Sequence, residues 1–347
     1  MTEEILKWYK QNKRDLPWRS NKEPYNIWVS EIILQQTQIK TGLLYYSKFL
    51  HKYPNVLTLA STTEEEMLNL WQGLGYYNRA LNMLKTAKEI ASNYNGIFPS
   101  TYNVLITLKG IGPYTAAAIS SICIDEKRAV LDGNVFRVIS RVHDIATPIN
   151  THKGQIDFQK IADSLLPNQN IGEYNQGIMD FGAIQCTKHK PNCSQCPIRK
   201  KCQSFILDII KNRPVKLKRN KLKTRHLHYF LIYHNQYFYI QKRANQDIWY
   251  KLFELPLIES SEKMTEIKIK NNNYLNVIKG SKITHKYDIT HILSHQKLKI
   301  SFWEIQSIQS IQSNNNWKKI NFKQISEHAF PKPIKKYFES KKFKLTI

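Results

Sequence analysis

Two carboxylates, Glu31 and Asp132, occupy positions at which one could act as an acid catalyst and the other as its ionised partner. Glu31 falls in a segment of helical period. Ile27 precedes it by four residues and Leu34 follows it by three, so the carboxylate projects from an apolar stripe. Such a carboxylate is shielded from water, which raises its pKa toward that of a general acid. An acid in a helix is more often solvated or paired, so both interpretations stay open here.

Asp132 stands between an apolar run, Val130–Leu131, and a segment of helical period that we expect to form a helix over Val135–Ile145. Its simplest role is a helix N-cap, worth about 1 kcal/mol. An acid at this junction could also face a ligand. A desolvated acid beside an ionised carboxylate is the arrangement that glycoside-type cleavage needs, because its transition state resembles an oxocarbenium ion.

Four of the five cysteines lie within 17 residues, as Cys186, Cys193, Cys196 and Cys202. Disulfides are not expected in an intracellular chain. Zinc ribbons usually present two Cys-x2-Cys pairs, whereas this segment has one pair and long outer spacings. An iron–sulfur cubane needs four thiolates and accepts such a loop. The spacing favours iron–sulfur over zinc without excluding zinc, and the many basic side chains of loop 186–202 suit a phosphate backbone.

Gly110 and Gly112 lie in a turn between two helical segments, Tyr102–Leu108 and Tyr114–Cys123. The Gly-x-Gly does not follow a strand, which disfavours dinucleotide binding. Glycines before a helix leave its first N–H groups free to bind a phosphate without reading sequence. The pattern indicates a DNA-binding hairpin, with an ordinary helix–helix turn as the alternative.

Helices must position these residues, because the first two hundred positions show short segments of helical period and almost no alternation. The clearest are Glu3–Lys13, which Pro17 follows, and a longer segment over Tyr25–Tyr46. We therefore predict a compact all-α domain over residues 1–210, including the cysteine loop 186–202.

The pattern changes after Cys202. Residues 211–225 contain eight Lys or Arg and no acid, a composition typical of a solvated linker. Residues 226–347 then show the alternation of aromatic and β-branched residues typical of strands, followed by a short amphipathic helix over Ile334–Glu339. The predicted strands are His228–His234, Tyr237–Gln241, Lys282–Thr290 and Lys297–Glu304. We interpret 226–347 as a separate α+β domain.

Length and charge narrow the classes of protein. A chain of 347 residues suits two domains, and 52 basic against 27 acidic residues give a net charge of +25. Residues 1–210 carry 24 basic and 18 acidic residues, and residues 211–347 carry 28 and 9. This excess implies a polyanionic partner. No apolar run is long enough for a membrane helix and the N-terminus has no signal-peptide order, so we expect a soluble, intracellular, cytoplasmic protein.

Several motifs together resemble the adenine DNA glycosylases of the MutY type, within the helix-hairpin-helix glycosylase superfamily. In the N-terminal half they are Leu16-Pro17-Trp18-Arg19, Ser30-Glu31-Ile32-Ile33-Leu34-Gln35-Gln36-Thr37-Gln38, Gly73-Leu74-Gly75-Tyr76-Tyr77, Leu108-Lys109-Gly110-Ile111-Gly112-Pro113-Tyr114-Thr115, Leu131-Asp132-Gly133-Asn134-Val135, Asp180-Phe181-Gly182-Ala183 and the cysteine loop. Beyond them lie Trp249-x3-Phe253-Glu254-Leu255-Pro256, His291-x2-Ser294-His295 and Ala329-Phe330-Pro331. The resemblance spans nearly the whole chain and implies a 4Fe-4S cluster on Cys186, Cys193, Cys196 and Cys202.

The resemblance also implies a role for each matching residue. Glu31 matches the general acid that protonates adenine at N7 and later helps to activate water, and Asp132 matches the carboxylate that stabilises the sugar cation. Tyr114 and Asn134 match residues that support this chemistry. The expected contacts to the flipped base and the DNA are Arg14, Trp18, Arg19, Gln36, Thr37, Tyr76, Gly110 and Gly112. The implied substrate is adenine mispaired with 8-oxoguanine, or with guanine, in double-stranded DNA.

Tyr114 separates two branches of the superfamily. Bifunctional relatives such as endonuclease III carry a Lys there, whose amine forms a Schiff base with the sugar. A phenol cannot form an imine, so we expect hydrolysis without efficient strand cleavage. Two alternatives remain: an endonuclease III-like enzyme for oxidised pyrimidines, and a catalytically silent DNA-binding iron–sulfur protein. Tyr114 disfavours the first, and intact Glu31 and Asp132 disfavour the second.

The C-terminal domain resembles the Nudix-like module of the same family. Nothing in 226–347 supplies the Gly-x5-Glu-x7-Arg-Glu-x-x-Glu-Glu box of a true Nudix hydrolase, so we expect a surface that recognises the lesion base. Ser294 matches the residue expected to sense 8-oxoguanine, and His291 matches a neighbouring contact. Leu293 stands where the family has Phe, which removes an aromatic contact. A polar strand face is the simpler interpretation of His291 and Ser294. We expect a monomer that binds DNA and no membrane.

Overall fold

The computed structural model describes residues 1–218, 222–244, 246–272, 274–275, 281–308 and 316–341. The chain divides into two compact units, Met1–Thr62 with Asn82–Arg219, and Thr63–Leu81 with Asn220–Ile347. Among the described residues, no helix is long and apolar enough to cross a membrane.

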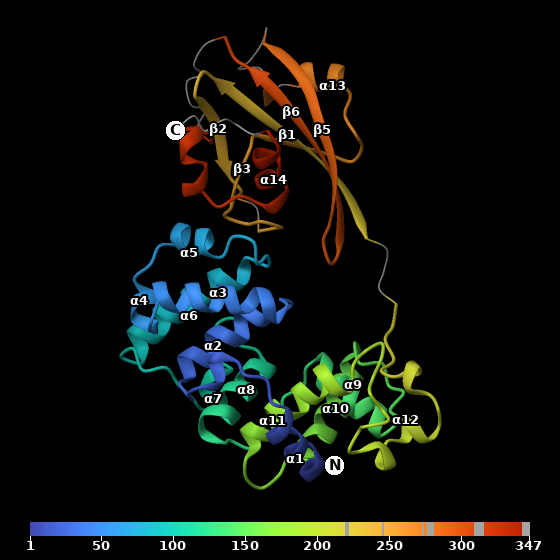
Figure 1. Cartoon of the computed structure of the whole chain (residues 1–347). Helices are drawn as coiled ribbons and strands as arrows, with labels where there is room; N and C mark the ends of the chain where they lie inside the picture. Colours follow the sequence, from blue (N-terminus) through green and yellow to red (C-terminus); the bar gives the residue numbers. More distant parts are fainter. Residues whose placement is uncertain (219–221, 245, 273, 276–280, 309–315, 342–347) are drawn as a thin grey trace. The chain divides into compact units, whose positions relative to one another are not determined.

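The first unit is helical, as the sequence predicts (Figure 1). Its α-helices are α1 (Thr2–Asn12), α2 (Pro24–Leu34), α3 (Ile39–Lys52), α4 (Val56–Ala60), α6 (Asn78–Asn93), α7 (Tyr102–Leu105), α8 (Pro113–Ile124), α9 (Gly133–Val142), α10 (His152–Ser164), α11 (Ile171–Asp180) and α12 (Gln203–Ile206). Short helical turns complete it: η1 (Pro17–Arg19), η2 (Phe181–Gln185), η3 (Arg199–Lys201) and η4 (Ile210–Asn212). Helix α6 begins in the segment grouped with the second unit.

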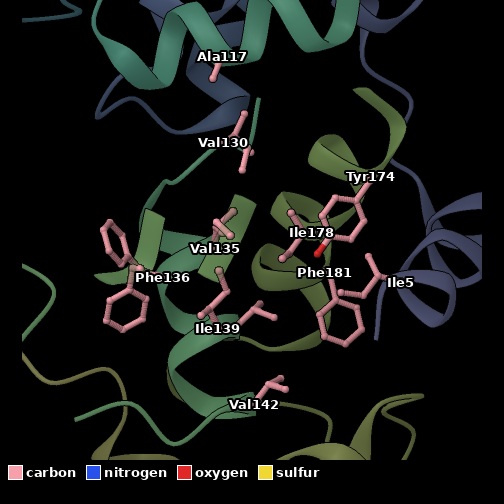
Figure 2. Packing of buried hydrophobic residues seen from close by; sticks show 14 of the residues in the cluster. Ile5, Ala117, Val130, Val135, Phe136, Ile139, Val142, Tyr174, Ile178 and Phe181 are labelled. Carbon is pink, nitrogen blue, oxygen red and sulfur yellow. The ribbon is translucent and has the colours of Figure 1, made fainter. Parts of the chain in front are cut away.

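The core of this unit lies between α1, α9 and α11. Figure 2 shows Val135 and Ile139 of α9 beside Ile178 and Phe181, and all four belong to one buried cluster. Val135, Ile139 and Phe181 are fully buried, because α9 turns its apolar stripe inward at helical spacing. Truncating a side chain such as Ile139 to alanine would cost about 2–5 kcal/mol. This packing fixes the N-terminus of α9, which carries Asp132.

The predicted single helix over Tyr25–Tyr46 is wrong. Helix α2 ends at Leu34 and α3 begins at Ile39, with Gln36 between them in the left-handed region at φ 56°. The reason is the polar run from Gln35 to Gln38, which offers no apolar side chain to continue the buried stripe of α2. Three residues of this run, Gln35, Gln36 and Thr37, line the cavity described below.

The second unit contains a mixed sheet (Figure 1). Its strands are β1 (Lys223–His234), β2 (Tyr237–Lys242), β3 (Phe253–Glu254), β4 (Leu257–Ser260), β5 (Lys282–Ile292), β6 (Gln296–Gln306) and β7 (Lys318–Asn321). The order is β3-β2-β1-β6-β5, with β4 on β1 and β7 on β2. Strands β1 and β6 are parallel, with Tyr229 opposite Phe302, and β5 and β6 form an antiparallel hairpin. Helices α5 (Glu64–Leu70), α13 (Glu266–Lys270) and α14 (Lys332–Ser340) and the turn η6 (Phe322–Glu327) accompany the sheet.

Apolar clusters cover both faces of this sheet, so consecutive residues in the middle of β1 are buried. Strand β1 begins at Lys223, which places the last residues of the predicted linker 211–225 in the sheet; residues 219–221 of that segment lie outside the described part. The grouping of Thr63–Leu81 with the sheet departs from the predicted domain 1–210. Within this unit Lys251 pairs with Glu64, and Asn69 donates to the carbonyl of Ser326 at 3.2 Å.

Candidate active site

A cavity of about 560 Å³ opens in the helical unit, a size within the usual range for small-molecule pockets. Most of the residues predicted to do chemistry or to contact the base line it. The lining consists of Arg14, Leu16, Trp18, Arg19, Glu31, Leu34, Gln35, Gln36, Thr37, Ile39, Tyr114, Asp132, Gly133, Asn134 and Met179. Polar groups from η1, α2, α8 and the start of α9 therefore converge on one space.

Glu31 is 9% exposed on α2, a helix whose other turns pack against α3 and α8. Burial raises the pKa of this carboxyl to about 7. A hydrogen bond from Tyr114 and the charge of Arg19 act in the opposite direction, and the charge of Asp132 adds to the rise. Glu31 can therefore hold a proton near neutral pH and release it to a substrate.

Tyr114 is the second residue of α8 and reaches the same cavity. Its hydroxyl also lies 3.3 Å from the Sδ atom of Met179. Burial raises the pKa of the phenol well above its ordinary value, and the neighbouring charges of Glu31 and Asp132 add to this. Tyr114 is thus a neutral donor beside Glu31, and it carries no amine.

Asp132 is the N-cap of α9 and also lines the cavity, so both interpretations of this residue apply. Its Oδ1 atom accepts from the backbone N–H groups of Asn134 and Val135, each at 2.8 Å, and its Oδ2 atom accepts from Asn134 Nδ2 at 2.8 Å. Burial raises the pKa of Asp132 above its ordinary value, although these hydrogen bonds and the charge of Arg137 act in the opposite direction. The carboxylate is held in one orientation by three donors.

Asn134 joins Asp132 to the cysteine loop. Its Oδ1 atom accepts from the guanidinium of Arg137 at 2.8 Å, and Arg137 Nε donates to the carbonyl of Cys186 at 2.8 Å. Gly182 lies so close that a Cβ atom there would stand 2.7 Å from Asn134 Cβ. Sequence reasoning missed Arg137, although its place one turn after Asn134 on a short helix was a usable signal.

Arg14 and Arg19, two of the expected contacts to the flipped base and the DNA, share one buried partner, Asp180. Arg19 donates to both oxygens of Asp180, at 2.8 and 2.9 Å, and Arg14 Nε donates at 3.0 Å. Trp18 lies between them in sequence, is 8% exposed, and packs edge-to-face on Tyr46 with ring centroids 5.3 Å apart. Asp180 was another residue that sequence reasoning missed. It stood in a motif that carries the family resemblance, Asp180-Phe181-Gly182-Ala183, but no role was assigned to it.

Gln36 and Thr37 lie at the turn between α2 and α3, on the wall of the cavity. Gln36 is exposed and adopts the left-handed backbone conformation, and the backbone N–H of Thr37 donates to the carbonyl of Leu34 at 3.0 Å. The turn therefore presents two polar side chains at the cavity, as a contact to DNA would require.

The hairpin turn fits the predicted phosphate site. Gly110 has φ 81°, and a Cβ atom there would stand 2.7 Å from Asn82 Cβ, so both conformation and space require glycine. Gly112 is the N-cap of α8, and no side chain caps its N–H groups. A Cβ atom on Gly112 would meet nothing within 4 Å. The N-terminus of α8 is thus open to an anion.

All four predicted cluster cysteines line one small cavity of about 20 Å³. None of them forms a disulfide. No three His, Cys, Asp or Glu side chains of the described residues meet closely enough to hold a single metal ion. Arg141, 2% exposed, supports the loop by donating to Cys186 Sγ at 3.3 Å and to the carbonyls of Thr187 and Lys188 at 2.7 and 3.1 Å. Four sulfur donors around one cavity form a donor set that fits an iron–sulfur cluster.

The remaining predicted residues lie in the second unit. Tyr76 is 48% exposed in the left-handed conformation at φ 48°, with the guanidinium of Arg79 5.7 Å from its ring. Ser294 is exposed in the turn of the β5–β6 hairpin, and the ring of His291 lies 6.0 Å from that of Trp249. Leu293, half-buried, packs against the sheet core. Ser294 and His291 therefore lie on one hairpin.

Comparison with known proteins agrees with this fold. Residues 29–162 match the HhH-GPD superfamily of base excision DNA repair proteins, and residues 228–340 match the NUDIX domain. The solved structure of a thermostable thymine-DNA glycosylase is 30% identical with a TM-score of 0.55, covering 59% of this chain and 95% of that chain. The predicted combination of a helix-hairpin-helix domain and a Nudix-like α+β domain is confirmed.

Two relatives match over nearly the whole length of both chains. The adenine DNA glycosylase of Buchnera aphidicola subsp. Baizongia pistaciae is 39% identical over 96% of this chain and 94% of the relative. The adenine DNA glycosylase of Buchnera aphidicola subsp. Acyrthosiphon pisum is 35% identical over 97% of this chain and 96% of the relative. Together with the helical fold, these matches show that the chain belongs to the adenine DNA glycosylase family of base excision repair enzymes.

Proposed function

We propose that this chain removes adenine from A:8-oxoguanine and A:G mispairs in duplex DNA by hydrolysing the N-glycosidic bond. The observation that carries the proposal is the pairing of Glu31, buried with a pKa of about 7, with Asp132, held by three N–H donors, in one cavity. Because their surroundings differ, one carboxyl can be protonated and act as a general acid while the other is ionised and stabilises positive charge on the sugar.

The reaction would begin with the flipped adenine in the cavity. Glu31 donates its proton to N7 of the base, which makes adenine a better leaving group. The bond from C1′ to N9 then breaks, its electron pair goes to the base, and positive charge develops on the sugar. Asp132 stabilises that oxocarbenium ion, either as a charge or by a transient bond to C1′.

Water completes the reaction. The ionised Glu31 carboxylate takes a proton from a water molecule as its oxygen attacks C1′, so Glu31 returns to its protonated form. Tyr114, as a neutral donor, keeps the Glu31 carboxylate oriented through both steps. Because Tyr114 cannot form an imine, the product is an abasic site in an intact strand.

DNA binding would draw on separate groups. The uncapped N-terminus of α8 at Gly112 would bind a phosphate, and the exposed lysines of the cysteine loop would add charge. Gln36 and Thr37 would be inserted beside the lesion base, which offsets part of the unstacking cost of a few kcal/mol, and Tyr76 would add a further contact to the DNA. Ser294 and His291 would recognise the lesion base.

We also propose that Cys186, Cys193, Cys196 and Cys202 hold a 4Fe-4S cluster. The cluster would serve to hold the loop of residues 186–202 in a fixed conformation for DNA. Iron–sulfur protein is brown and contains about four irons, whereas a zinc protein is colourless. Visible absorption and metal analysis of the purified protein would therefore test this proposal without any activity assay.

A duplex cleavage assay tests the proposed function. Strands with A opposite 8-oxoguanine or guanine should be cut only after alkali, because hydrolysis leaves an abasic site. A duplex with T opposite G serves as a comparison, since one structural neighbour is a thymine-DNA glycosylase. Strand cleavage without alkali, together with a protein–DNA adduct trapped by borohydride, would instead favour an endonuclease III-like lyase. The absence of product from every mispair would favour a catalytically silent DNA-binding protein.

A further inference from the structure

Asp180 is a fully buried carboxylate in an unfavourable place. It is the last residue of α11, whose helical backbone continues into η2, and it has 0% exposure. Burying an ionised carboxylate is costly unless charged or hydrogen-bonding groups pair with it. The carboxylate must therefore be held by specific partners.

Those partners are Arg14 and Arg19. Both oxygens of Asp180 accept from Arg19, Oδ1 also accepts from the Arg14 side chain, and Oδ2 accepts from the Arg14 backbone N–H at 3.3 Å. Arg19 also donates to the carbonyl of Arg14 at 3.1 Å. One carboxylate thus fixes the segment that connects α1 to η1 and carries both arginines.

Asp180 itself does not line the cavity, whereas Arg14 and Arg19 do. A buried ion pair is weak evidence for a stability device, because the cost of desolvating the charges often cancels their attraction. An arrangement of one buried acid and two arginines at a pocket wall is better explained by the geometry and charge that it imposes on the pocket.

We propose that Asp180 is a positioning residue for adenine excision: it holds Arg14 and Arg19 in place at the pocket wall and offsets their positive charge beside Glu31. This inference rests on the proposed function. Asp180 acts through the two arginines and touches neither base nor sugar, so it is not a catalytic residue.

The charges around both carboxyls support this role. The groups that act on Glu31 are Tyr114 on α8, Asp132 before α9 and Arg19 on η1, and of the charges only Arg19 favours the ionised form. Around Asp180 lie Arg14 and Arg19, and Tyr9 of α1 interacts with all three of these charges and with that of Glu173 of α11.

Burial alone would raise the pKa of Asp180, but its hydrogen bonds to Arg19 and Arg14 hold it below the ordinary value. Asp180 is therefore ionised at neutral pH and opposes the two arginine charges. Without it, Arg19 would act on Glu31 unopposed, and the proton that Glu31 must donate would be lost at a lower pH.

The test is Asp180→Asn, which keeps the shape of the side chain and removes its charge. The full-length protein is titrated by ¹³C NMR of the Glu carboxyl carbons, with Glu31→Gln used to identify the Glu31 signal. We expect the titration midpoint of Glu31 to fall in Asp180→Asn. Single-turnover adenine excision should lose rate above the new midpoint, by about tenfold for each further increase of one in pH.

Asp144→Asn is the matched control, since Asp144 pairs with Arg213 at 2.8 Å and does not line the cavity. It should leave the Glu31 midpoint unchanged. If Asp180→Asn does not fold, Arg19→Gln keeps the proposal testable, because removing that charge should move the midpoint upward. The double variant Asp180→Asn, Arg19→Gln should lie closer to the unsubstituted protein than either single variant.

An unchanged Glu31 midpoint in folded Asp180→Asn would overturn the inference, as would an equal loss of rate at every pH. Where Asp180→Asn does not fold, an unchanged midpoint in Arg19→Gln would overturn it. The NMR titration needs no substrate, so it separates this inference from the proposed function. If the unsubstituted protein excised no adenine, the proposed function would fail whatever the titration showed.

Discussion

Glu31 and Asp132 line the same cavity but have opposite hydrogen-bonding environments. Asp132 accepts three N–H donors at 2.8 Å, whereas Glu31 has the phenol of Tyr114 as the hydrogen-bond partner that lowers its pKa. Charge-assisted donors stabilise an ionised carboxylate, and burial without them stabilises the protonated form. The surroundings thus assign the proton to Glu31 and the charge to Asp132.

Replacing the acid should stop the chemistry without stopping binding. We expect Glu31→Gln to reduce single-turnover adenine excision by about 10³-fold, the middle of the usual range for a general acid–base residue. Affinity for an A:8-oxoguanine duplex should change little, since the amide keeps the size of the side chain. Glu23→Gln, an exposed acid just before the same helix, is the control and should behave like the unsubstituted protein. Near-normal excision by Glu31→Gln would contradict the assignment.

The raised pKa of Glu31 predicts how stability depends on pH. Its pKa is about 7 in the folded chain and about 4.5 as the ordinary value, so the folded state holds an extra proton between those limits. The free energy of unfolding contributed by this group is therefore full below pH 4.5 and is lost as the pH rises through 7. A difference of one in pKa between the folded and unfolded states corresponds to about 1.4 kcal/mol.

Urea unfolding of the unsubstituted protein and of Glu31→Gln at pH 5 and pH 8 would measure this. Glu31→Gln should lose less stability between the two pH values than the unsubstituted protein does. An equal loss of stability in both proteins between pH 5 and pH 8 would mean that the pKa of Glu31 is not raised in the folded chain. Excision by the unsubstituted protein should likewise fall above pH 7, where Glu31 has lost its proton.

Removing the phenol of Tyr114 should raise the pH above which excision falls. Tyr114 donates to Glu31 and so lowers the pKa that burial has raised. In Tyr114→Phe the carboxyl loses this donor, and we expect the upper limit of the pH–rate profile to shift to higher pH. The shape of the pocket is nearly kept, so binding should survive. Tyr45→Phe, on the neighbouring helix α3 and outside the cavity lining, is the control. A profile that moved downward would mean that Tyr114 opposes ionisation of Glu31.

Arg137 should matter through Asn134. Its guanidinium bonds Asn134 Oδ1 and the carbonyl of Cys186, and so ties the orientation of Asp132 to the cysteine loop. Arg137→Lys keeps the charge, but a single ammonium group cannot donate to both acceptors as the guanidinium does. We expect a loss of about 1–3 kcal/mol in the free energy of unfolding. A misplaced Asp132 should also slow excision, by up to about 10²-fold.

The control for Arg137→Lys is Arg128→Lys, because Arg128 is 41% exposed and its pair with Glu126 is worth little. Thermal unfolding and single-turnover rates of both variants give the comparison. Equal behaviour of the two variants would show that the link between Asn134 and the cysteine loop does not support catalysis.

The sequence predicted local features better than junctions. The cysteine spacing and the place of Asp132 before a helix were readable because neighbours in the chain create them. The break at Gln36 was not, since apolar residues at helical spacing resume at Ile39 after the polar run, and the sequence does not show the left-handed backbone of Gln36. Asp180 was missed for another reason. Its partners lie about 160 residues away, at Arg14 and Arg19, and one sequence carries no record of that proximity.

The two hairpin glycines should separate stability from DNA binding. Gly110 has φ 81° and Asn82 occupies the place of a Cβ atom, so Gly110→Ala should destabilise the fold by at least about 1 kcal/mol. Gly112 has an extended backbone and open space, so Gly112→Ala should leave the free energy of unfolding within about 0.5 kcal/mol.

DNA affinity should respond differently to Gly112→Ala. The added methyl group projects into the space that a phosphate would need at the N-terminus of α8, and we expect weaker duplex binding at every sequence. Fluorescence anisotropy over a range of salt concentrations would test this. The slope of log affinity against log salt concentration should change by less than the loss of one lysine–phosphate contact would cause, because the lost donors are uncharged backbone N–H groups. Unchanged affinity in Gly112→Ala, with the fold intact, would mean that the backbone phosphate is bound elsewhere on the chain.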